Sequence, residues 1–324
     1  MATSANNRLL AIGNEALAEL VDLAGGAAAT WQAVETQGID ALARHYDAVG
    51  VLEPPAGGLD PVGNLVRACA RAAKTVVLAG PAADGPATFD DLASICAAHD
   101  VGLLGLCLSA FSPAGRAMIA AAQQQTAGEP VYLRYATEVG GPVAALPWTL
   151  AGAAALAAQA LGAPESIYVT GVRDQGGTLV HLAAHVRHAN GGVALLGIGA
   201  ARGEGRTGSD TSLRRRPAST LFLGNRGAVE QNLVAGGVLT RDGPGGPNES
   251  RFERLRRDDV RQPALVGWLA AAAGLARGEG RERGASTARL LSAVVTAARR
   301  SLVGGRPERI VLSLGSGTGA ASCG

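Results

Sequence analysis

Apolar positions in the first part of the chain follow two alternating patterns. Short continuous apolar runs are separated by segments in which apolar residues recur at helical spacing. Strand–helix alternation at this pitch is typical of βαβ units, so the pattern predicts a parallel sheet covered by helices. The apolar runs are 8–12, 27–31, 48–52, 75–79 and 101–106, and the helical segments are 16–23, 39–45, 59–73, 89–98 and 110–125.

The pattern changes after Gly128. Asn190-Gly191 separates two strand-like stretches and is a strong hairpin signal. We expect an open, mainly antiparallel sheet with helices on one face, and irregular loops at 200–218 and 241–262, which are rich in Gly, Pro and Arg. The predicted strands are 131–136, 166–172, 179–188 and 193–198, and the predicted helices are 149–161 and 287–300.

The chain of 324 residues is therefore predicted to form two α/β-class domains. Residues 1–127 are expected to be Rossmann-like, residues 128–312 an α+β domain, and residues 313–324 a flexible tail. The N-terminus shows no signal-peptide pattern, which predicts a cytoplasmic protein. A net charge of +2 gives no electrostatic reason to expect nucleic-acid or membrane binding. The short basic run Arg214-Arg215-Arg216 is interpreted as a solvated loop.

The titratable side chains form no metal-binding pattern. The four cysteines are far apart and include no C-x-x-C pair. His181, His185 and His188 are the densest histidine cluster, and on a helix the first two would be zinc candidates. The hairpin signal favours a strand, on which His181 and His185 lie about 13 Å apart, too far to share one metal ion. We interpret this strand as the polar face of an open sheet.

Several segments, in order, resemble the Gfo/Idh/MocA oxidoreductase family. Each segment is short, but their order and spacing together cover most of residues 8–312. The matching segments are Tyr46–Val49 with Pro54-Pro55, Ala73–Pro81, Phe111-Ser112-Pro113, Asn190-Gly191-Gly192, Leu223–Gly227 and Ala298–Arg306.

This resemblance implies an N-terminal Rossmann domain joined to a C-terminal domain with an open antiparallel sheet. It also implies NAD(P)-dependent oxidoreductase activity and an oligomer formed through the open sheet, either with a second copy or with another protein. The cleft between the domains is the implied small-molecule site. The residues placed at the cofactor site are Ile12, Gly13, Asn14, Glu15, Glu53, Pro54 and Pro81.

The phosphate-binding turn departs from the family pattern. Such a turn has the pattern Gly-x-Gly, because glycine at these positions lets phosphate approach the backbone at a helix N-terminus. In this chain Gly13-Asn14-Glu15 stands at the same place. Glu15 brings bulk and negative charge to this position, either opposing phosphate or occupying the anion site itself. An ordinary acidic first turn with a displaced loop is the alternative. Ala18, at the third glycine position, is small enough to be tolerated.

The residues that the resemblance implies for catalysis are also missing. Ala79-Gly80-Pro81 replaces the family's Glu-Lys-Pro, and Lys74 lies at the opposite end of that strand. The positions of the family's helical His and Asp fall near Gly152 and Ala155 or Leu156. Trp31 and Gln32 stand where an acid would hold the ribose, and we expect core or surface roles for both. No catalytic residue is therefore assigned.

Three functions remain open from the sequence. The first is a degenerate family member without cofactor or catalysis that acts as a binding or scaffolding partner of an active relative or pathway enzyme. The second is an active NAD(P)-dependent oxidoreductase on a sugar-like or small carbonyl or hydroxyl substrate, using displaced residues. The third is a small-molecule site with new chemistry in the old cleft. No cofactor is expected if the first function is correct. NAD(P) is expected if the second is correct.

Overall fold

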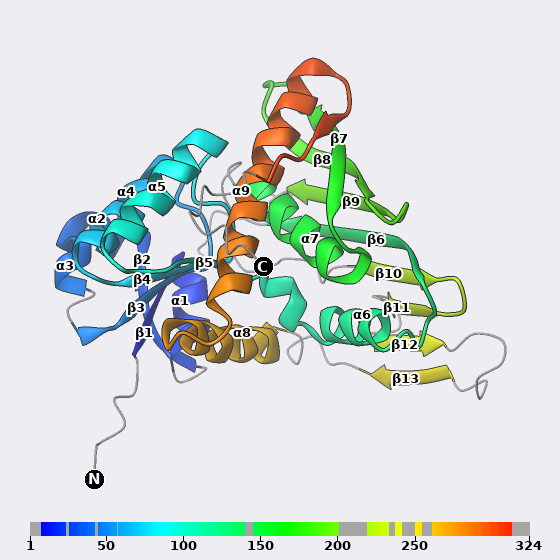
Figure 1. Ribbon diagram of the computed structural model, residues 1–324, viewed down its shortest axis with the longest axis horizontal. Helices are drawn as coiled ribbons and strands as arrows, with labels where there is room; N and C mark the ends of the chain where they lie inside the picture. Colours follow the sequence, from blue (N-terminus) through cyan, green and yellow to red (C-terminus); the bar gives the residue numbers. More distant parts are fainter. Residues whose placement is uncertain are drawn as a thin grey trace, which may run out of the picture.

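The computed structural model contains two sheets with helices packed between and around them (Figure 1). One sheet comes from the N-terminal part of the chain and the other from the C-terminal part. The structure describes residues 8–23, 26–42, 45–56, 58–139, 145–200, 219–232, 237–241, 250–254 and 261–312.

The N-terminal sheet has five parallel strands in the order β2-β1-β3-β4-β5. Its central strands are buried on both faces, which explains why they appear in the sequence as continuous apolar runs. The predicted Rossmann-like parallel sheet is confirmed. The strands are β1 (Leu9–Gly13), β2 (Ala27–Thr30), β3 (Ala48–Val51), β4 (Thr75–Leu78) and β5 (Leu103–Gly105).

Helices cover both faces of this sheet. One face packs against α4 and α5, together with the short helices α2 and α3, in a core that includes Val66 and Leu92. The other face packs against α1 and against α8, which comes from late in the chain. These helices are α1 (Glu15–Leu23), α2 (Trp31–Gln37), α3 (Ile39–Leu42), α4 (Asp60–Arg71), α5 (Pro86–Ala98) and α8 (Arg261–Ala276).

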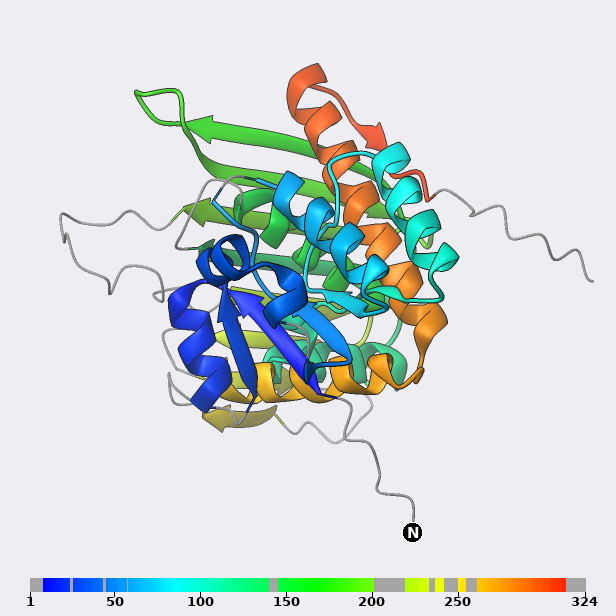
Figure 2. The ribbon, with the colours of Figure 1, turned by 90° about the vertical axis from the view of Figure 1, so that its left-hand side faces the viewer.

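Helix α8 runs across the N-terminal strands (Figure 2) and is anchored there by Trp268. The Trp268 side chain is fully buried, and its indole N–H donates to the carbonyl of Leu106 at 3.0 Å. A Cβ atom on Gly50 would lie only 2.9 Å from the Trp268 ring, so glycine lets the ring contact β3 directly. The domain boundary at residue 127 stays a prediction. Helix α8 follows that boundary in sequence and yet packs on the N-terminal sheet.

The C-terminal sheet has nine strands in the order β13-β12-β11-β10-β6-β9-β8-β7-β14 among the described residues. Every neighbouring pair is antiparallel except β6 and β9, which are parallel. The prediction of a mainly antiparallel sheet is confirmed. The strands are β6 (Pro130–Val139), β7 (Pro164–Arg173), β8 (Leu179–His188), β9 (Val193–Ala200), β10 (Ser219–Gly224), β11 (Ala228–Asn232), β12 (Gly237–Arg241), β13 (Ser250–Arg254) and β14 (Glu308–Arg309).

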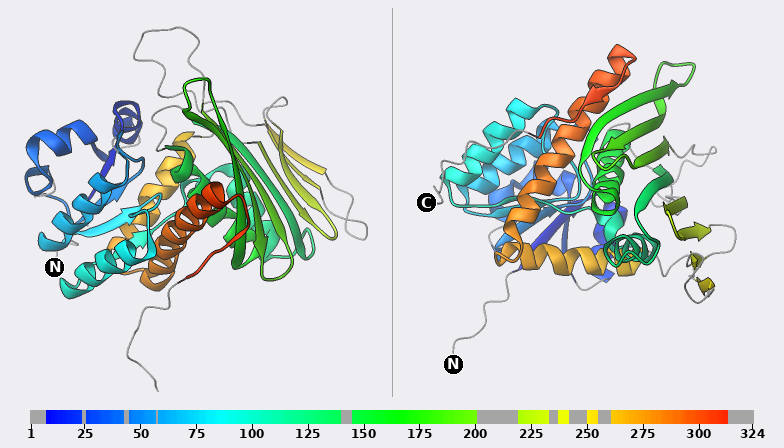
Figure 3. Two further views of the ribbon diagram at one scale, coloured as in Figure 1. Left: turned by 90° about the horizontal axis from the view of Figure 1, so that it is seen from above. Right: turned by 45° about the vertical axis from the view of Figure 1, so that its right-hand side comes forward.

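Helices α6 (Pro113–Gln123), α7 (Ala145–Leu161) and α9 (Arg281–Gly304) cover one face of this sheet, and the 3₁₀-helix η2 (Leu108–Phe111) precedes α6. Figure 3 shows α7 and α9 on the side that faces the N-terminal sheet. Small residues allow this close layering: a Cβ atom on Gly105 of β5 would lie 2.5 Å from the backbone nitrogen of Ala288 in α9.

Strand β8 alternates as the sequence predicts. Leu182, Ala184 and Val186 are buried, whereas His185 and Arg187 are exposed on the opposite face. The predicted hairpin is also present. Gly191 adopts a φ of +83°, which a glycine reaches without strain, and β8 and β9 pair on either side of it.

Some sequence predictions need correction. Residues 250–254 form β13 rather than part of an irregular loop, and α8 begins at Arg261. Helices α7 and α9 begin earlier than expected, at Ala145 and Arg281. These segments lack clear caps and periodicity, and pairing or burial in the tertiary structure decides their conformation. The predictions for 201–218, including Arg214–Arg216, for 242–249 and for the tail 313–324 lie outside the described residues.

Within the ranges that the structure describes, no helix is long and apolar enough to cross a membrane. The same ranges contain no group of three or more His, Cys, Asp or Glu side chains positioned to hold a metal ion.

His188 makes stability depend on pH. Its side chain is fully buried at the end of β8, and burial lowers its pKa below the usual value of 6.5. The Nδ1 atom donates to the Gly162 carbonyl at 2.8 Å, while Nε2 is buried without a partner. Since the unfolded chain binds a proton more readily, the stability from neutral His188 is present above pH 6.5 and falls as the pH drops below it.

We predict that His188→Asn flattens this pH dependence, because an asparagine amide donates to Gly162 without titrating. Urea unfolding between about pH 7.5 and pH 5 should show the wild-type chain losing its stability advantage over the variant as the pH falls. His99→Asn, at an exposed position, is the matched control. Parallel pH profiles for wild type and His188→Asn would contradict this account.

Candidate functional site

Gly13 and Asn14 connect β1 to α1 in a short turn. A Cβ atom on Gly13 would lie 2.8 Å from Cδ2 of Leu17, so a side chain at this position would have to displace the end of the Leu17 side chain. Asn14 caps α1: its backbone carbonyl accepts from Ala18 at 2.9 Å, and its side-chain Oδ1 accepts from the Leu17 N–H at 3.0 Å. Glu15 is the first helical residue and is exposed.

Hydrogen bonds tie this turn to the ends of β2 and β3. Asn14 Nδ2 donates to the carboxylate of Glu53, which follows β3. The indole N–H of Trp31, at the start of α2, donates to the Glu53 carbonyl at 2.9 Å. Trp31 is only 9% exposed and packs in the core of the sheet, whereas Gln32 is exposed. We expected a core or surface role for both residues, and the structure places Trp31 in the core and Gln32 on the surface.

A pocket of about 240 Å³ opens beside these turns. It lies at the carboxyl ends of β1 and β3, where the chain passes to β2 on one side and to β4 on the other. Open parallel sheets bind ligands at such a topological switch point. Its lining residues are Gly13, Asn14, Glu15, Thr30, Trp31, Gln32, Glu53, Pro54, Pro55, Ala56 and Ala145.

The structure brings together five of the seven residues predicted at the cofactor site: Gly13, Asn14, Glu15, Glu53 and Pro54. The other two do not line the pocket, since Ile12 is fully buried in β1 and Pro81 is buried after β4. The predicted site did not include four further lining residues, Thr30, Pro55, Ala56 and Ala145. Thr30 has a local signal, because its hydroxyl caps α2 by accepting from Ala33.

At the carboxyl end of β4, Gly80 lies directly against Trp148 from the other domain. A Cβ atom on Gly80 would lie 2.2 Å from two atoms of the Trp148 ring, so the ring occupies the space that any side chain at position 80 would need. Trp148 is 3% exposed and packs in the core of the N-terminal sheet. The sequence prediction missed Trp148 because it started this helix at position 149, whereas α7 begins at Ala145.

Helix α7 continues over the same end of the sheet. A Cβ atom on Gly152 would be 3.8 Å from the Ala79 carbonyl, an ordinary contact distance. The Gly152 carbonyl accepts from the Cys107 thiol at 2.9 Å, and burial raises the pKa of Cys107 to about 11. Cys107 is therefore a structural thiol. Ala155 and Leu156, where the resemblance puts catalytic groups, are buried apolar residues.

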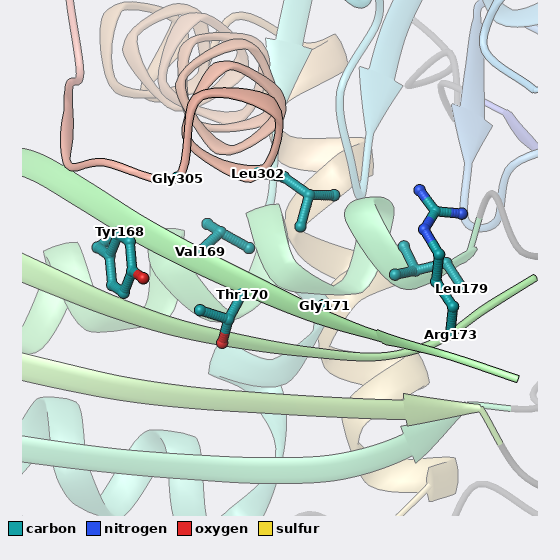
Figure 4. Close-up of a pocket in the computed structure, with 8 residues that line it drawn as sticks. All are labelled: Tyr168, Val169, Thr170, Gly171, Arg173, Leu179, Leu302 and Gly305. Atoms are coloured by element: carbon teal, nitrogen blue, oxygen red, sulfur yellow. The ribbon is translucent and has the colours of Figure 1, made fainter. Parts of the chain in front are cut away.

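A second hollow, of about 300 Å³, lies at the outer part of β7 beside the last turn of α9. Figure 4 shows Tyr168 and Thr170 on the opposite side of β7 from Val169 and Leu302. Arg173 is the one charged residue among those that line it. This hollow extends around β7, and the polar side chains that line it do not point toward a common centre.

Comparison with known proteins identifies the fold. No protein-family model matches the chain, and no curated protein matches it in sequence. Many solved structures match, among them an oxidoreductase from Agrobacterium radiobacter in complex with NAD+, L-tartaric acid and magnesium, with a TM-score of 0.70 and 15% identity. That match covers 94% of this chain and 98% of the other.

Two further solved structures are similar. An NAD-binding oxidoreductase from Klebsiella pneumoniae has a TM-score of 0.64 and 14% identity, over 94% of this chain and 89% of its own. Levoglucosan dehydrogenase in complex with NADH has a TM-score of 0.66 and 11% identity, over 94% and 90%. The chain therefore has the two-domain fold of NAD-binding oxidoreductases, and the fold implied by the Gfo/Idh/MocA resemblance is confirmed.

The contact between Gly80 and Trp148 predicts a specific sensitivity. Gly80→Ala should destabilise the chain by about 3 kcal/mol, because the new methyl group overlaps a buried ring held between two domains. The cost should fall in a Trp148→Leu background, where the ring is absent, and urea unfolding of both single variants and the double variant measures this coupling.

Gly152→Ala is the matched control for this cycle, because its Cβ has room and alanine favours a helix. It should change stability by no more than about 1 kcal/mol, in the stabilising direction. Equal costs of Gly80→Ala with and without Trp148 would show that the ring does not fill this space.

Proposed function

We propose that this chain is a non-catalytic protein with an oxidoreductase fold, which no longer transfers hydride with NAD(P) and acts by binding. The contact of Trp148 with Gly80 carries the proposal. In the resembling family a catalytic lysine stands at this position, whereas here a buried indole fills the space in front of the backbone. Position 80, at the end of β4, therefore carries no proton-donating side chain, and the Trp148 ring leaves no room for one.

The residue types on α7 support the same proposal. Hydride transfer to a carbonyl needs a proton donor, whose loss costs roughly 10²- to 10⁴-fold in rate. The positions that the resemblance assigns to His and Asp carry glycine, alanine or leucine, packed within the protein. Cys107, the nearby thiol, holds its proton because burial raises its pKa to about 11.

The phosphate turn supports loss of cofactor affinity. A dinucleotide phosphate binds to free N–H groups at the start of a helix, favoured by the helix dipole. Here the Asn14 side chain already accepts from the Leu17 N–H, and Glu15 and Glu53 line the adjoining pocket. The site therefore offers a phosphate fewer donors and places two carboxylates near it.

An active NAD(P)-dependent oxidoreductase with displaced residues is the second candidate. The observation that favours it is the fold itself, because similar structures are described in complex with NAD+ or NADH. A third candidate, new chemistry on a small molecule in the cleft, is favoured by the pocket of about 240 Å³. A ligand that copurifies with the chain and is identified by mass spectrometry would favour the third candidate over the first.

A thermal-shift titration separates the first two candidates. Millimolar NADH or NADPH should leave the melting temperature of the wild-type chain unchanged. A cofactor present at 100 times its dissociation constant would instead add about 2.7 kcal/mol of stability, which such an experiment detects readily. A cofactor-dependent shift would overturn the non-catalytic proposal.

Glu15→Gly tests which end of the site opposes the cofactor. If Glu15 alone opposes phosphate, this variant should bind ADP-ribose, which has the pyrophosphate but no nicotinamide, and NADH equally well. We expect no measurable NADH binding, because Trp148 fills the far end, and at most weak ADP-ribose binding, because Asn14 still caps α1. Isothermal titration measures both. Glu19→Gly, on the exposed side of α1, controls for the helix-destabilising effect of glycine.

The open face of the C-terminal sheet is the surface that we propose for partners, either a second copy or another protein. It presents Tyr168, His185 and Leu195 side by side on β7, β8 and β9, and both Tyr168 and Leu195 are more than one-third exposed. Exposed apolar side chains on a regular sheet surface favour burial against another protein.

We predict that Leu195→Glu disrupts this association, because it puts a charge in the middle of the face. Light scattering after size exclusion should show a lower mass for the variant than for the wild-type chain. Val303→Glu, which changes a 90% exposed residue at the end of α9, should leave the mass unchanged. A wild-type monomer, or the same mass for all three chains, would contradict a self-association interface.

A further inference from the structure

We infer that the outer edge of β7, beyond the end of β14, binds an extended acidic peptide segment of another protein as an added strand. This site is independent of cofactor binding, because its lining shares no residue with the pocket at the ends of β1 and β3. Exposed strand edges are templates for pairing with another chain. Three features support the assignment: the backbone groups that face outward, the hollow beside them and the charge of its lining.

Strand β7 extends well past its outer neighbour. Strand β14 is only two residues long and pairs with residues 166–167 of β7. Beyond this pair, the Val169 N–H donates to Ser301 Oγ at 2.9 Å. Among the described residues, no strand pairs with the outer side of β7 after that point. Residues 170–178, which run through the turn to β8, are all exposed. The edge is therefore open to solvent from Gly171 onward.

The hydrogen bonds of β7 identify the backbone groups that face outward. In an antiparallel strand, successive residues turn their N–H and C=O groups alternately toward one neighbour and the other. The Asp174 N–H donates to the Thr178 carbonyl, toward β8, whereas the Val169 N–H donates outward to α9. Even-numbered residues therefore pair with β8, and odd-numbered residues face the edge. Gly171 and Arg173 thus each present one N–H and one C=O to an added strand.

The hollow of about 300 Å³ lies along this edge and is suited to an apolar side chain. A Cβ atom on Gly171 would lie 2.7 Å from Cδ1 of Leu179 and 3.0 Å from Cδ1 of Leu302, so these leucines flank the strand where it carries no side chain. Figure 4 shows both leucines on the same side of β7 as Val169. Because directly opposite residues of paired strands point to the same face of a sheet, an apolar residue paired with Gly171 enters the hollow beside the leucines. Pockets for alternate side chains give this mode of binding its specificity.

The charge of the lining selects an acidic residue. Arg173 is the charged residue among those that line the hollow. Its Nη1 atom donates to the Gly177 carbonyl at 2.7 Å, and the guanidinium carries further N–H donors. In antiparallel pairing, the residue two positions before the one opposite Gly171 stands opposite Arg173 on the same face. Opposite charges in such cross-strand pairs attract each other. The bound segment therefore has the pattern acid-x-apolar.

The peptide acetyl-Thr-Asp-Thr-Val-Thr-amide has this pattern and tests the inference. Amide hydrogen exchange, followed by NMR, should slow at Gly171 and Arg173 at least about twofold once the peptide reaches its dissociation constant. Thr170 and Val172, which already pair with β8, should change less. No slowing at Gly171 and Arg173 in the millimolar range, or equal slowing at all four amides, would overturn the inference.

Methyl groups on the peptide nitrogens separate strand addition from simple apolar contact. N-methylation of the Asp and Val residues removes the two donors that face β7. It should weaken binding at least about tenfold, because each lost hydrogen bond costs roughly threefold to tenfold in affinity. N-methylation of the last two Thr residues, whose nitrogens face away from β7, is the matched control and should have little effect. Equal weakening by the two modifications would show that the peptide does not bind as a strand.

A charge exchange tests the role of Arg173. Arg173→Glu should weaken binding of the peptide at least about threefold and should strengthen binding of the version with Lys in place of Asp. Leu195→Glu, on the open face of the sheet, should leave peptide binding unchanged. If wild type and Arg173→Glu bind both peptides equally, the acidic specificity is wrong. Slowed exchange at Gly171 and Arg173 that depends on protein concentration without peptide would assign the edge to a second copy and overturn the assignment.

Discussion

The contact between the Trp148 ring and the Gly80 backbone fixes how the two domains meet. It brings the first turn of α7 onto the carboxyl end of β4, where a side chain at Gly80 would overlap the ring. One turn later, the Gly152 carbonyl receives the Cys107 thiol, and this second contact holds the helix along the same edge. The carboxyl end of β4 is therefore filled by packing between the two domains.

The three tryptophans of the chain pack around the N-terminal sheet. Trp31, Trp148 and Trp268 come from distant parts of the sequence, and all three pack in cores around the N-terminal sheet. The remaining contacts between layers depend on small residues, as where β5 crosses α9 at Gly105 and Ala288. Close backbone approach through small residues leaves little room for larger side chains at these contacts.

The other end of the cleft holds the pocket at the carboxyl ends of β1 and β3. A turn that would expose donors to phosphate is capped by Asn14, and the capping side chain also binds Glu53. The same three turns, at the ends of β1, β2 and β3, now enclose two carboxylates and a tryptophan.

The sequence by itself determined the five strands of the N-terminal sheet, the helices α1, α3, α4 and α5, the β8–β9 hairpin and the turn at Gly13, because hydrophobic period, glycine and Asn-Gly act locally. It also located the missing lysine at Gly80. It missed α2, since the predicted strand 27–31 ran into the first residue of that helix. Only the tertiary structure decided that Trp148 fills that space, that α8 covers the first sheet and that Asn14 reaches Glu53. These contacts join residues far apart in the chain, and Ala-rich segments such as α7 carry no periodicity that reveals which neighbour they pack against.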